Sequence, residues 1–480
     1  MSVHEDNSGP QKFRLSALLE GHTDDVRALA CDSSSRLFSA SRDGTARSWT
    51  QKGLRTGRTG GWEQDGLFGG HQGFVNSVTW WGGNSSGAGD SNPGYLITGG
   101  QDSLINVFDL AAADLSSVPT LTLSGHSSNV CALHAVGDFL VSGSWDCTAR
   151  VWNIAKNWEC ERILEGHRAA VWDVLALKTA KYEGAVITAC ADGLIRLFKP
   201  ESQTASVIFK GHTEPVRALA KVLPEDPLCV LFASCSNDGS VIIWNYAGNS
   251  ITTLAGHKDS FIYALVSISA ASGGGMASSG EEGIVKVWDE EEGDEEQEII
   301  VPALSVWSLA SLPNGDLAIA DSDNLIWVFT RDASRAADSA TTSDYEKRLA
   351  NRPKPAAKNA AKPPLPIVDA SILEAEGSKD GEVKLVEVDG KVHAYQWNGG
   401  EWADLGEVTG QEPTPEANGQ SASSGSKKMS HDGVAYDFVI DIDVSDDKPA
   451  LKLPFNLEGT SLQLSLFGFT IADCESKWSR

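Results

Sequence analysis

Residues 121–154 read LTLSGHSSNVCALHAVGDFLVSGSWDCTARVWNI, and this stretch decides the fold. It holds a Gly-His pair at Gly125-His126, two alternating apolar runs, and Asp146 followed six positions later by Trp152. Period-two alternation with β-branched and aromatic residues, bounded by Gly, Asn and Asp, predicts short β-strands. The stretch therefore predicts three strands of one sheet, preceded by 121–123 as the last strand of the sheet before it.

The same pattern recurs through the first 330 residues. Six Gly-His pairs, about 40 to 55 residues apart, contain His22, His71, His126, His167, His212 and His257. Seven times an acidic residue precedes an aromatic residue by six positions, namely Asp43–Trp49, Asp102–Phe108, Asp146–Trp152, Asp192–Phe198, Asp238–Trp244, Glu282–Trp288 and Asp323–Phe329. Such a period is typical of a propeller, in which no unit buries its apolar face alone. We predict an all-β protein whose residues 1–330 form a seven-bladed WD40 β-propeller.

Closure of this ring has a candidate strand at the N-terminal end. Residues 13–19 precede the first Gly-His pair and have no blade of their own. We expect 13–19 to pair with 325–330 as the outer strand of blade seven, because that pairing removes two open sheet edges. Blade seven, at about 299–330, has no Gly-His pair, and we expect it to be the least regular blade.

The recurring histidines and acidic residues permit a catalytic or a structural interpretation. An active site is not copied from blade to blade, so we favour a buried network of His, turn Asp, strand Ser and Trp indole. Such a network is tolerated in a core when every polar group has a partner. The predicted pairs are His22–Asp43, His71–Asp102, His126–Asp146, His167–Asp192 and His212–Asp238.

One end of the propeller channel is a candidate interaction surface. Residues around the start of each first strand, and residues before each turn Asp, should point towards this end. Exposed Trp and Arg residues dominate the energetics of many interfaces. The alternative is that the tryptophans only fill the channel mouth. The candidate residues are Arg27, Arg42, Phe74, Asn76, Trp145, Trp172, Arg217 and Trp307.

Composition and motifs narrow the function. The net charge of −26 argues against a grip on nucleic-acid phosphates. Eight cysteines without C-x-x-C spacing indicate free thiols in a reducing compartment. No apolar run reaches the length of a membrane span, and no nucleophile, phosphate-loop or metal-ligand motif is present. We expect a monomer of the cytoplasm and nucleus, with no membrane insertion, no catalysis, no cofactor and no metal.

A second domain follows the repeats. Residues 331–366 are polar and rich in Ala, Pro and Lys, which predicts a flexible linker in which 345–350 is compatible with a short helical turn. Asp389-Gly390 is a strong two-residue hairpin signal. Alternating segments on both sides of it predict a small β-rich (α+β) domain at 367–456, with strands at 381–388, 391–397, 401–408, 436–444 and 451–456.

The motifs KLV, AYQW, EW…GEV, YDFVIDIDV and LKLPFN in this region resemble the PFU domain. That domain is the ubiquitin-binding module of the phospholipase A-2-activating protein family, whose members join a seven-bladed WD-repeat propeller to it. The resemblance implies an adaptor that binds ubiquitin and ubiquitin chains through both domains. It also implies action with the valosin-containing AAA ATPase in ubiquitin homeostasis and ubiquitin-dependent degradation or sorting. Candidate PFU contacts, about half of which we expect to face the domain core, are Tyr395, Trp397, Trp402 and Phe438.

The chain departs from the family pattern at its end. Family members contact the ATPase through a C-terminal helical-repeat PUL domain, whereas residues 457–480 form an atypical tail in which neither that domain nor the closing PFU helix is recognised. The resemblance therefore implies ubiquitin binding more strongly than direct ATPase binding. The alternative function is a general WD-repeat interaction scaffold that is not specific for ubiquitin.

Overall fold

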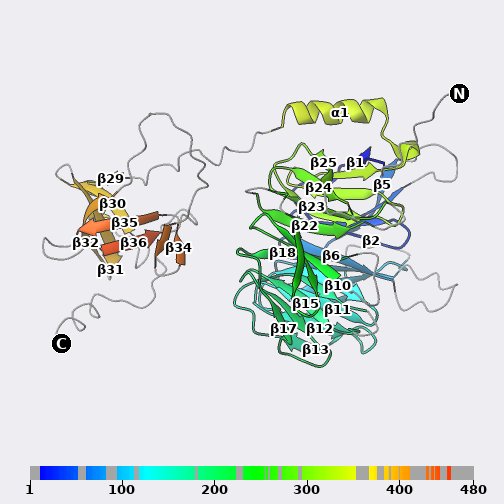
Figure 1. Ribbon diagram of the computed structural model, residues 1–480, viewed down its shortest axis with the longest axis horizontal. Helices are drawn as coiled ribbons and strands as arrows, with labels where there is room; N and C mark the ends of the chain where they lie inside the picture. The colour runs from blue at the N-terminus through cyan, green and yellow to red at the C-terminus, as the bar shows by residue number, and fades with distance from the viewer. Residues whose placement is uncertain are drawn as a thin grey trace. The chain divides into compact units, whose positions relative to one another are not determined.

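The chain forms two compact units, Met1–Pro355 and Ala356–Arg480, and each is described by itself (Figure 1). The computed structural model describes residues 11–51, 61–82, 94–112, 118–178, 182–222, 231–254, 256–257, 260–268, 273–289, 295–352, 367–375, 383–388, 391–398, 400–410, 429–431, 434–436, 438–443 and 451–455.

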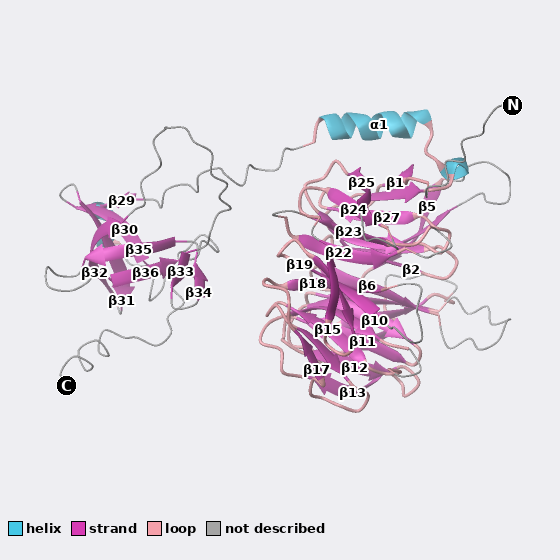
Figure 2. Cartoon of the chain, viewed as in Figure 1, coloured by secondary structure: helices cyan, strands magenta, loops and turns pink. Residues whose placement is uncertain are grey.

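The first unit consists of seven four-stranded antiparallel sheets, which confirms the predicted seven-bladed propeller (Figure 2). Blades one and two contain β2 (Val26–Cys31), β3 (Leu37–Ser41), β4 (Ala46–Gln51), β5 (Trp62–Phe68), β6 (Val75–Trp81), β7 (Tyr95–Gly100), β8 (Ile105–Asp109) and β9 (Leu121–Leu123). Blades three and four contain β10 (Val130–Val136), β11 (Phe139–Ser144), β12 (Ala149–Asn153), β13 (Glu159–Leu164), β14 (Val171–Ala176), β15 (Val186–Cys190), β16 (Ile195–Phe198) and β17 (Val207–Phe209).

The remaining blades complete the ring. Blades five and six contain β18 (Val216–Lys221), β19 (Leu231–Ser236), β20 (Val241–Asn245), β21 (Ser250–Leu254), β22 (Ile262–Ser267), β23 (Met276–Gly280), β24 (Ile284–Trp288) and β25 (Glu295–Ile300). Blade seven contains β26 (Val306–Ser311), β27 (Leu317–Asp321), β28 (Ile326–Thr330) and β1 (Arg14–Leu19). β1 pairs antiparallel with β28, from Arg14 opposite Thr330 to Leu19 opposite Ile326. The first strands of the blades contact one another in a closed cycle, since β26 also contacts β2.

Hydrophobic cores lie between neighbouring blades. Phe68 of blade one meets Phe108 of blade two edge to face, with ring centroids 5.2 Å apart, in a cluster that also holds Phe38 and Leu96. These buried side chains come from two sheets, so neither blade covers its apolar face alone.

Blade seven is a complete sheet, so the expectation that it is the least regular blade is wrong. All residues of β27 and β28 are buried. In place of a histidine network, the Asp321 carboxylate accepts the Trp327 indole N–H at 2.8 Å and the backbone N–H groups of Asp323 and Leu325. One buried carboxylate thus satisfies the indole and caps the turn.

The flexible linker predicted at 331–366 is wrong for residues 331–352. A 3-10 turn at Ala333–Arg335 is followed by α1 (Ser339–Ala350), whose N-cap Asp338 accepts the Thr341 N–H at 2.8 Å. The Tyr345 ring packs against Trp327 and Phe329. Hydrophobic contact with the propeller therefore fixes a segment whose own composition gives little signal. Residues 353–366 of the predicted linker lie outside the described residues.

The second unit is built on a six-stranded sheet in the order β29-β30-β31-β32-β35-β36, as its predicted β-rich character requires. β29 pairs parallel with β30 and the other neighbours are antiparallel. Leu385, Val386 and Ala394 are buried. The elements are β29 (Ile367–Asp369), a 3-10 helix at Ala370–Glu374, β30 (Val383–Val388), β31 (Lys391–Asn398), β32 (Glu401–Gly410), β33 (Met429–His431), β34 (Val434–Tyr436), β35 (Phe438–Asp443) and β36 (Leu451–Phe455).

Candidate functional site

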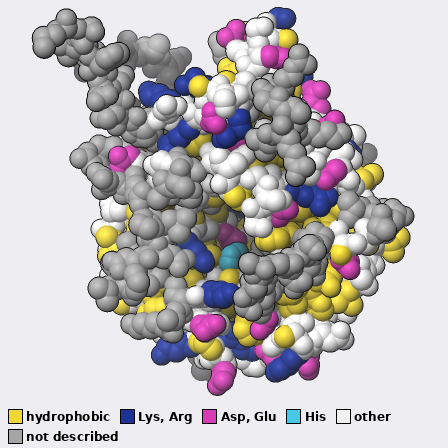
Figure 3. Space-filling model, turned by 90° about the vertical axis from the view of Figure 1, so that its right-hand side faces the viewer, with side chains coloured by type: hydrophobic (Ala, Val, Ile, Leu, Met, Phe, Trp, Pro, Cys, Tyr) yellow, Lys and Arg dark blue, Asp and Glu magenta, His cyan; other side chains and the backbone are white. Residues whose placement is uncertain are grey.

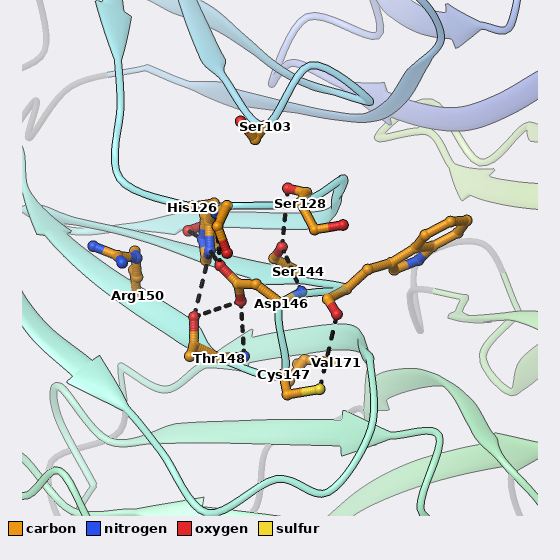
Figure 4. Close-up of polar contacts among 12 residues, drawn as sticks. Ser103, His126, Ser128, Ser144, Asp146, Cys147, Thr148, Arg150 and Val171 are labelled. Carbon is orange, nitrogen blue, oxygen red and sulfur yellow. Dashed lines mark hydrogen bonds and ion pairs between the residues drawn. The ribbon is translucent and has the colours of Figure 1, made fainter.

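The recurring histidines lie in buried hydrogen-bond networks, of which blade three gives an example (Figure 4). His126 Nδ1 lies 2.7 Å from Asp146, and His126 Nε2 lies 2.7 Å from the Ser142 hydroxyl. The Trp152 indole N–H donates to the same hydroxyl at 2.9 Å. Because a carboxylate only accepts, Nδ1 carries the histidine proton and Nε2 accepts from Ser142. Although burial opposes ionisation, hydrogen bonds from His126 and Thr148 hold the pKa of Asp146 well below its usual value.

Three further predicted pairs have the same direct contact. The His Nδ1 to Asp distances are 2.8 Å for His22–Asp43, 3.0 Å for His71–Asp102 and 2.9 Å for His212–Asp238. These histidine side chains are almost fully buried. Groups that are enclosed and fully paired stabilise the blades and are not presented to a substrate.

The predicted hydrogen bond between His167 and Asp192 in blade four is wrong. Asp192 instead forms a bidentate pair with Arg196, at 2.6 and 3.1 Å. His167 Nε2 bonds the Thr188 hydroxyl at 2.8 Å, while its Nδ1 has no hydrogen-bond partner among the described residues. Burial, reinforced by the Arg196 charge, lowers the pKa of His167 to about 4.

The eight predicted channel residues line one cavity of about 320 Å³ inside the ring of first strands: Arg27, Arg42, Phe74, Asn76, Trp145, Trp172, Arg217 and Trp307. Sequence reasoning missed Cys131 and Tyr263, which line the same cavity. Each first strand contributes its second residue, and the pairing register shifts there in every blade, as between Val26 and Ala28. A bulge re-aims the side chain at its position. Cys131 and Tyr263 could therefore have been found from the sequence, because each is the second residue of the first strand of its blade.

Aromatic rings and guanidinium groups form a continuous series around this cavity. Successive separations are 3.9 Å for Arg27–Trp307, 4.7 Å for Trp307–Tyr263, 5.0 Å for Tyr263–Arg217, 4.0 Å for Arg217–Trp172 and 5.5 Å for Trp172–Trp145. Cations stacked on aromatic faces are favourable contacts that hold both groups in place. The series is therefore a preorganised surface.

Exposed apolar side chains accompany the series. Trp145 is 48% exposed and Phe74 is 38% exposed, whereas Trp172 is half-buried. Phe261, which was missed, stands immediately before β22 as Phe74 stands before β6, and it is 41% exposed. Such exposure is costly in isolation and typical of interaction surfaces. We use the name channel-mouth surface for Phe74 and Phe261 together with the series of rings and guanidinium groups, which consists of Arg27, Trp307, Tyr263, Arg217, Trp172 and Trp145.

In the second unit, three of the four candidate aromatics share one face of the sheet. Tyr395 and Trp397 alternate along β31, and Trp402 lies opposite Trp397 on β32 with ring centroids 5.2 Å apart. The Trp402 indole N–H donates to the Ala375 carbonyl, and Lys384 lies over the Trp402 ring. All three aromatics are half-buried, and the expected split between core and surface stays a prediction. The side chain of the fourth candidate, Phe438, lies outside the described residues.

The face shown in Figure 3 has a hollow where a histidine side chain lies near basic, acidic and hydrophobic ones. No group of three His, Cys, Asp or Glu side chains in the described ranges could hold a metal ion. The six cysteines within those ranges are free. No helix among the described elements combines the length and apolar character needed to cross a membrane.

Both units match known families. Residues 375–465 match the family described as PFU (PLAA family ubiquitin binding). Residues 13–50, 117–153, 158–199, 203–245 and 248–289 match the family described as WD domain, G-beta repeat. A crystal structure of the WD40 β-propeller domain of Doa1 is similar to this chain at 34% identity and a TM-score of 0.57, covering 68% of this chain and all of that one.

Relatives extend the similarity across both units. The chain is 35% identical to the ubiquitin homeostasis protein lub1 of Schizosaccharomyces pombe, over 92% of this chain and 56% of that protein. It is 33% identical to protein DOA1 of Saccharomyces cerevisiae (93% and 56%), and 34% identical to the phospholipase A-2-activating protein of Xenopus laevis (95% and 54%). It thus spans about half the length of these relatives. The propeller, the PFU match and these relatives together establish that the chain belongs to the phospholipase A-2-activating protein family.

Proposed function

We propose that the protein is a non-catalytic adaptor that binds ubiquitin and ubiquitin chains. The match of residues 375–465 to a family described as ubiquitin-binding carries this proposal. The name of the relative lub1, a ubiquitin homeostasis protein, supports it. The face with Tyr395, Trp397 and Trp402 supplies apolar area, and the exposed carboxylates of Glu401 and Asp404 lie on the same strand pair. This combination suits an apolar patch ringed by basic residues, such as ubiquitin presents.

The channel-mouth surface is the proposed second ubiquitin site. It offers exposed Trp145 and Phe74 beside stacked arginines, the residue types that dominate interface energetics. Each site is expected to be weak, with a dissociation constant on the order of 100 μM, or ~5.5 kcal/mol. Weak individual sites suit a protein that must release its target.

The test titrates isotope-labelled ubiquitin with the full chain and follows NMR shift perturbations. Trp145→Ala with Trp172→Ala, and Trp397→Ala with Trp402→Ala, should each reduce the perturbations by removing one site. Ile208→Ala is the matched control, because Ile208 is exposed on an outer strand and does not line the cavity. Perturbations that neither pair alters, or that are absent with the parent chain, would favour a general WD-repeat scaffold.

We further propose that this ubiquitin binding serves the valosin-containing AAA ATPase. The family membership supports a role in ubiquitin-dependent degradation or sorting. Co-precipitation of the purified ATPase with the full chain, with and without ubiquitin chains, tests the partnership. Retention only when ubiquitin chains are present would indicate an indirect link through a shared target.

A further inference from the structure

Two arginines in the channel-mouth cavity have no direct ionic partner, although Asp173 also lines the cavity and the charge of Asp25 acts on Arg27. Arg42 is paired with Asp25 at 3.0 Å, but Arg27 and Arg217 form no ion pair or hydrogen bond with any described residue. Arg27 Nη1 is also buried without a partner. In a chain of net charge −26, two unpaired guanidiniums in one cavity are unexpected. A buried charge normally has a direct partner, so two guanidinium groups without one point to a bound anion.

The stacking of these arginines fixes how such an anion approaches. The Arg27 guanidinium carbon lies over the Trp307 ring at 3.9 Å, and that of Arg217 lies 4.0 Å from the centre of the Trp172 ring and 5.0 Å from that of Tyr263. The rings accept no conventional hydrogen bond from these groups, so guanidinium N–H groups remain available as donors. In-plane donors form the bidentate fork that recognises planar carboxylate edges and phosphate oxygens.

We propose that Arg27 and Arg217 form a subsite for a phosphate monoester, carried by a phosphorylated serine or threonine of a bound polypeptide. Phosphoserine carries about −1.5 to −2 charge and three strong acceptor oxygens at neutral pH. This charge matches two unpaired cations, whereas a carboxylate would leave one of them uncompensated. The cavity of about 320 Å³ accommodates one such side chain, with the aromatic rings beside it available to its neighbours.

Like-charge repulsion within the cavity is consistent with this assignment. Burial, together with the charges of Arg42 and Arg217, lowers the pKa of Arg27 to about 10. Arg27 nevertheless remains protonated at neutral pH. A bound dianion would relieve the repulsion and would bind better at low ionic strength, because the site is open to salt at its mouth.

The test uses the full chain and three peptides, Gly-Gly-X-Gly-Gly with phosphoserine, glutamate or serine at X, in calorimetric titrations at low salt. The phosphoserine peptide should bind at one site, at least tenfold more tightly than the glutamate peptide, with no detectable heat from the serine peptide. Arg217→Lys, which keeps the charge but loses the fork, should weaken binding about tenfold, and Arg27→Gln by at least as much. Lys156→Gln is the control, since it removes one positive charge from an exposed side chain outside the cavity.

Melting curves of each variant separate loss of the site from loss of the fold. If the phosphoserine and glutamate peptides bind equally, or if folded Arg27 and Arg217 variants keep parental affinity, the assignment is wrong. Absence of binding by the parent chain also overturns it. Failure of this proposal and failure of ubiquitin binding are read separately, because the peptides contain no ubiquitin and the ubiquitin titration uses no arginine variant.

Discussion

At the scale of single residues, the blades depend on polar groups that are enclosed and paired. His126 is held on one side by Asp146 and on the other by Ser142. Each bond contributes modestly when made, but a buried group that loses its partner costs its full desolvation free energy. This asymmetry explains why the His-Asp-Ser-Trp set recurs as a complete set.

Asp146→Ala should destabilise the propeller by about 1–3 kcal/mol, because His126 Nδ1 and the Thr148 hydroxyl lose their common partner. The measurement is the midpoint of thermal unfolding. Glu183→Ala is the matched control, since it removes an exposed carboxylate and should leave the midpoint unchanged. Equal midpoints for the parent chain and Asp146→Ala would contradict a stabilising role for the network.

His167 should make propeller stability depend on pH. Its pKa is about 4 in the folded state, mainly through burial, against about 6.5 when unfolded. The unfolded chain therefore binds more protons between these values, so the stability contribution is present above pH 6.5 and is lost as pH falls towards 4. Between pH 6.5 and 4, the free energy of unfolding of His167→Gln should fall by about 2–3 kcal/mol less than that of the parent chain. Parallel denaturant-derived stability curves for the two proteins would refute this.

At the scale of elements, α1 covers the region where the ring closes. The closing pair β1 and β28 joins residues more than 300 positions apart, and nothing in the local sequence holds them together. α1 contacts this region through Tyr345, and Arg348 pairs with Glu20 at 2.9 Å. The helix thus continues the propeller and reinforces the seam between β1 and β28.

Tyr345→Ala should lower the stability of the closed ring by about 2 kcal/mol, because Trp327 and Phe329 lose a packed ring and the Ile300 carbonyl loses a donor. Hydrogen exchange of the β1 and β28 backbone amides gives the readout, and these amides should exchange faster than those of β10 and β11. Lys347→Ala, at an exposed position on the same helix, should leave the exchange rates unaltered. If the β1 and β28 amides exchange at the same rate in both variants, α1 does not stabilise the pairing of these strands.

At the scale of the whole molecule, two separate units each carry a proposed ubiquitin site. Linking two weak sites raises affinity for a chain with several ubiquitin copies, provided that both sites can be occupied at once. Tetraubiquitin should therefore bind at least tenfold more tightly than monoubiquitin. Trp397→Ala with Trp402→Ala should remove this gain while leaving monoubiquitin binding at the channel-mouth surface, as measured by calorimetry. A gain that survives this double substitution would show that the sites act independently.

The sequence by itself determined the propeller, the number of its blades and the β-rich second domain. These follow from patterns with a fixed period, such as the spacing from Asp146 to Trp152, because each blade repeats one local solution to burial. It also located eight of the residues that line the cavity, since equivalent positions in a ring point in equivalent directions.

Only the tertiary structure decided which partners the residues at equivalent positions of the repeats contact. In blade four, Asp192 pairs with Arg196 and not with His167. In blade one, Arg47 has the same spacing from Asp43, yet Asp43 keeps its hydrogen bond with His22. Tyr345 orders a segment of polar composition because its partners come from β28. Arg27 and Arg217 lack direct ionic partners because of what surrounds them in the ring. Competition among the side chains that meet in the folded protein sets such pairings, and a one-dimensional pattern carries no record of it.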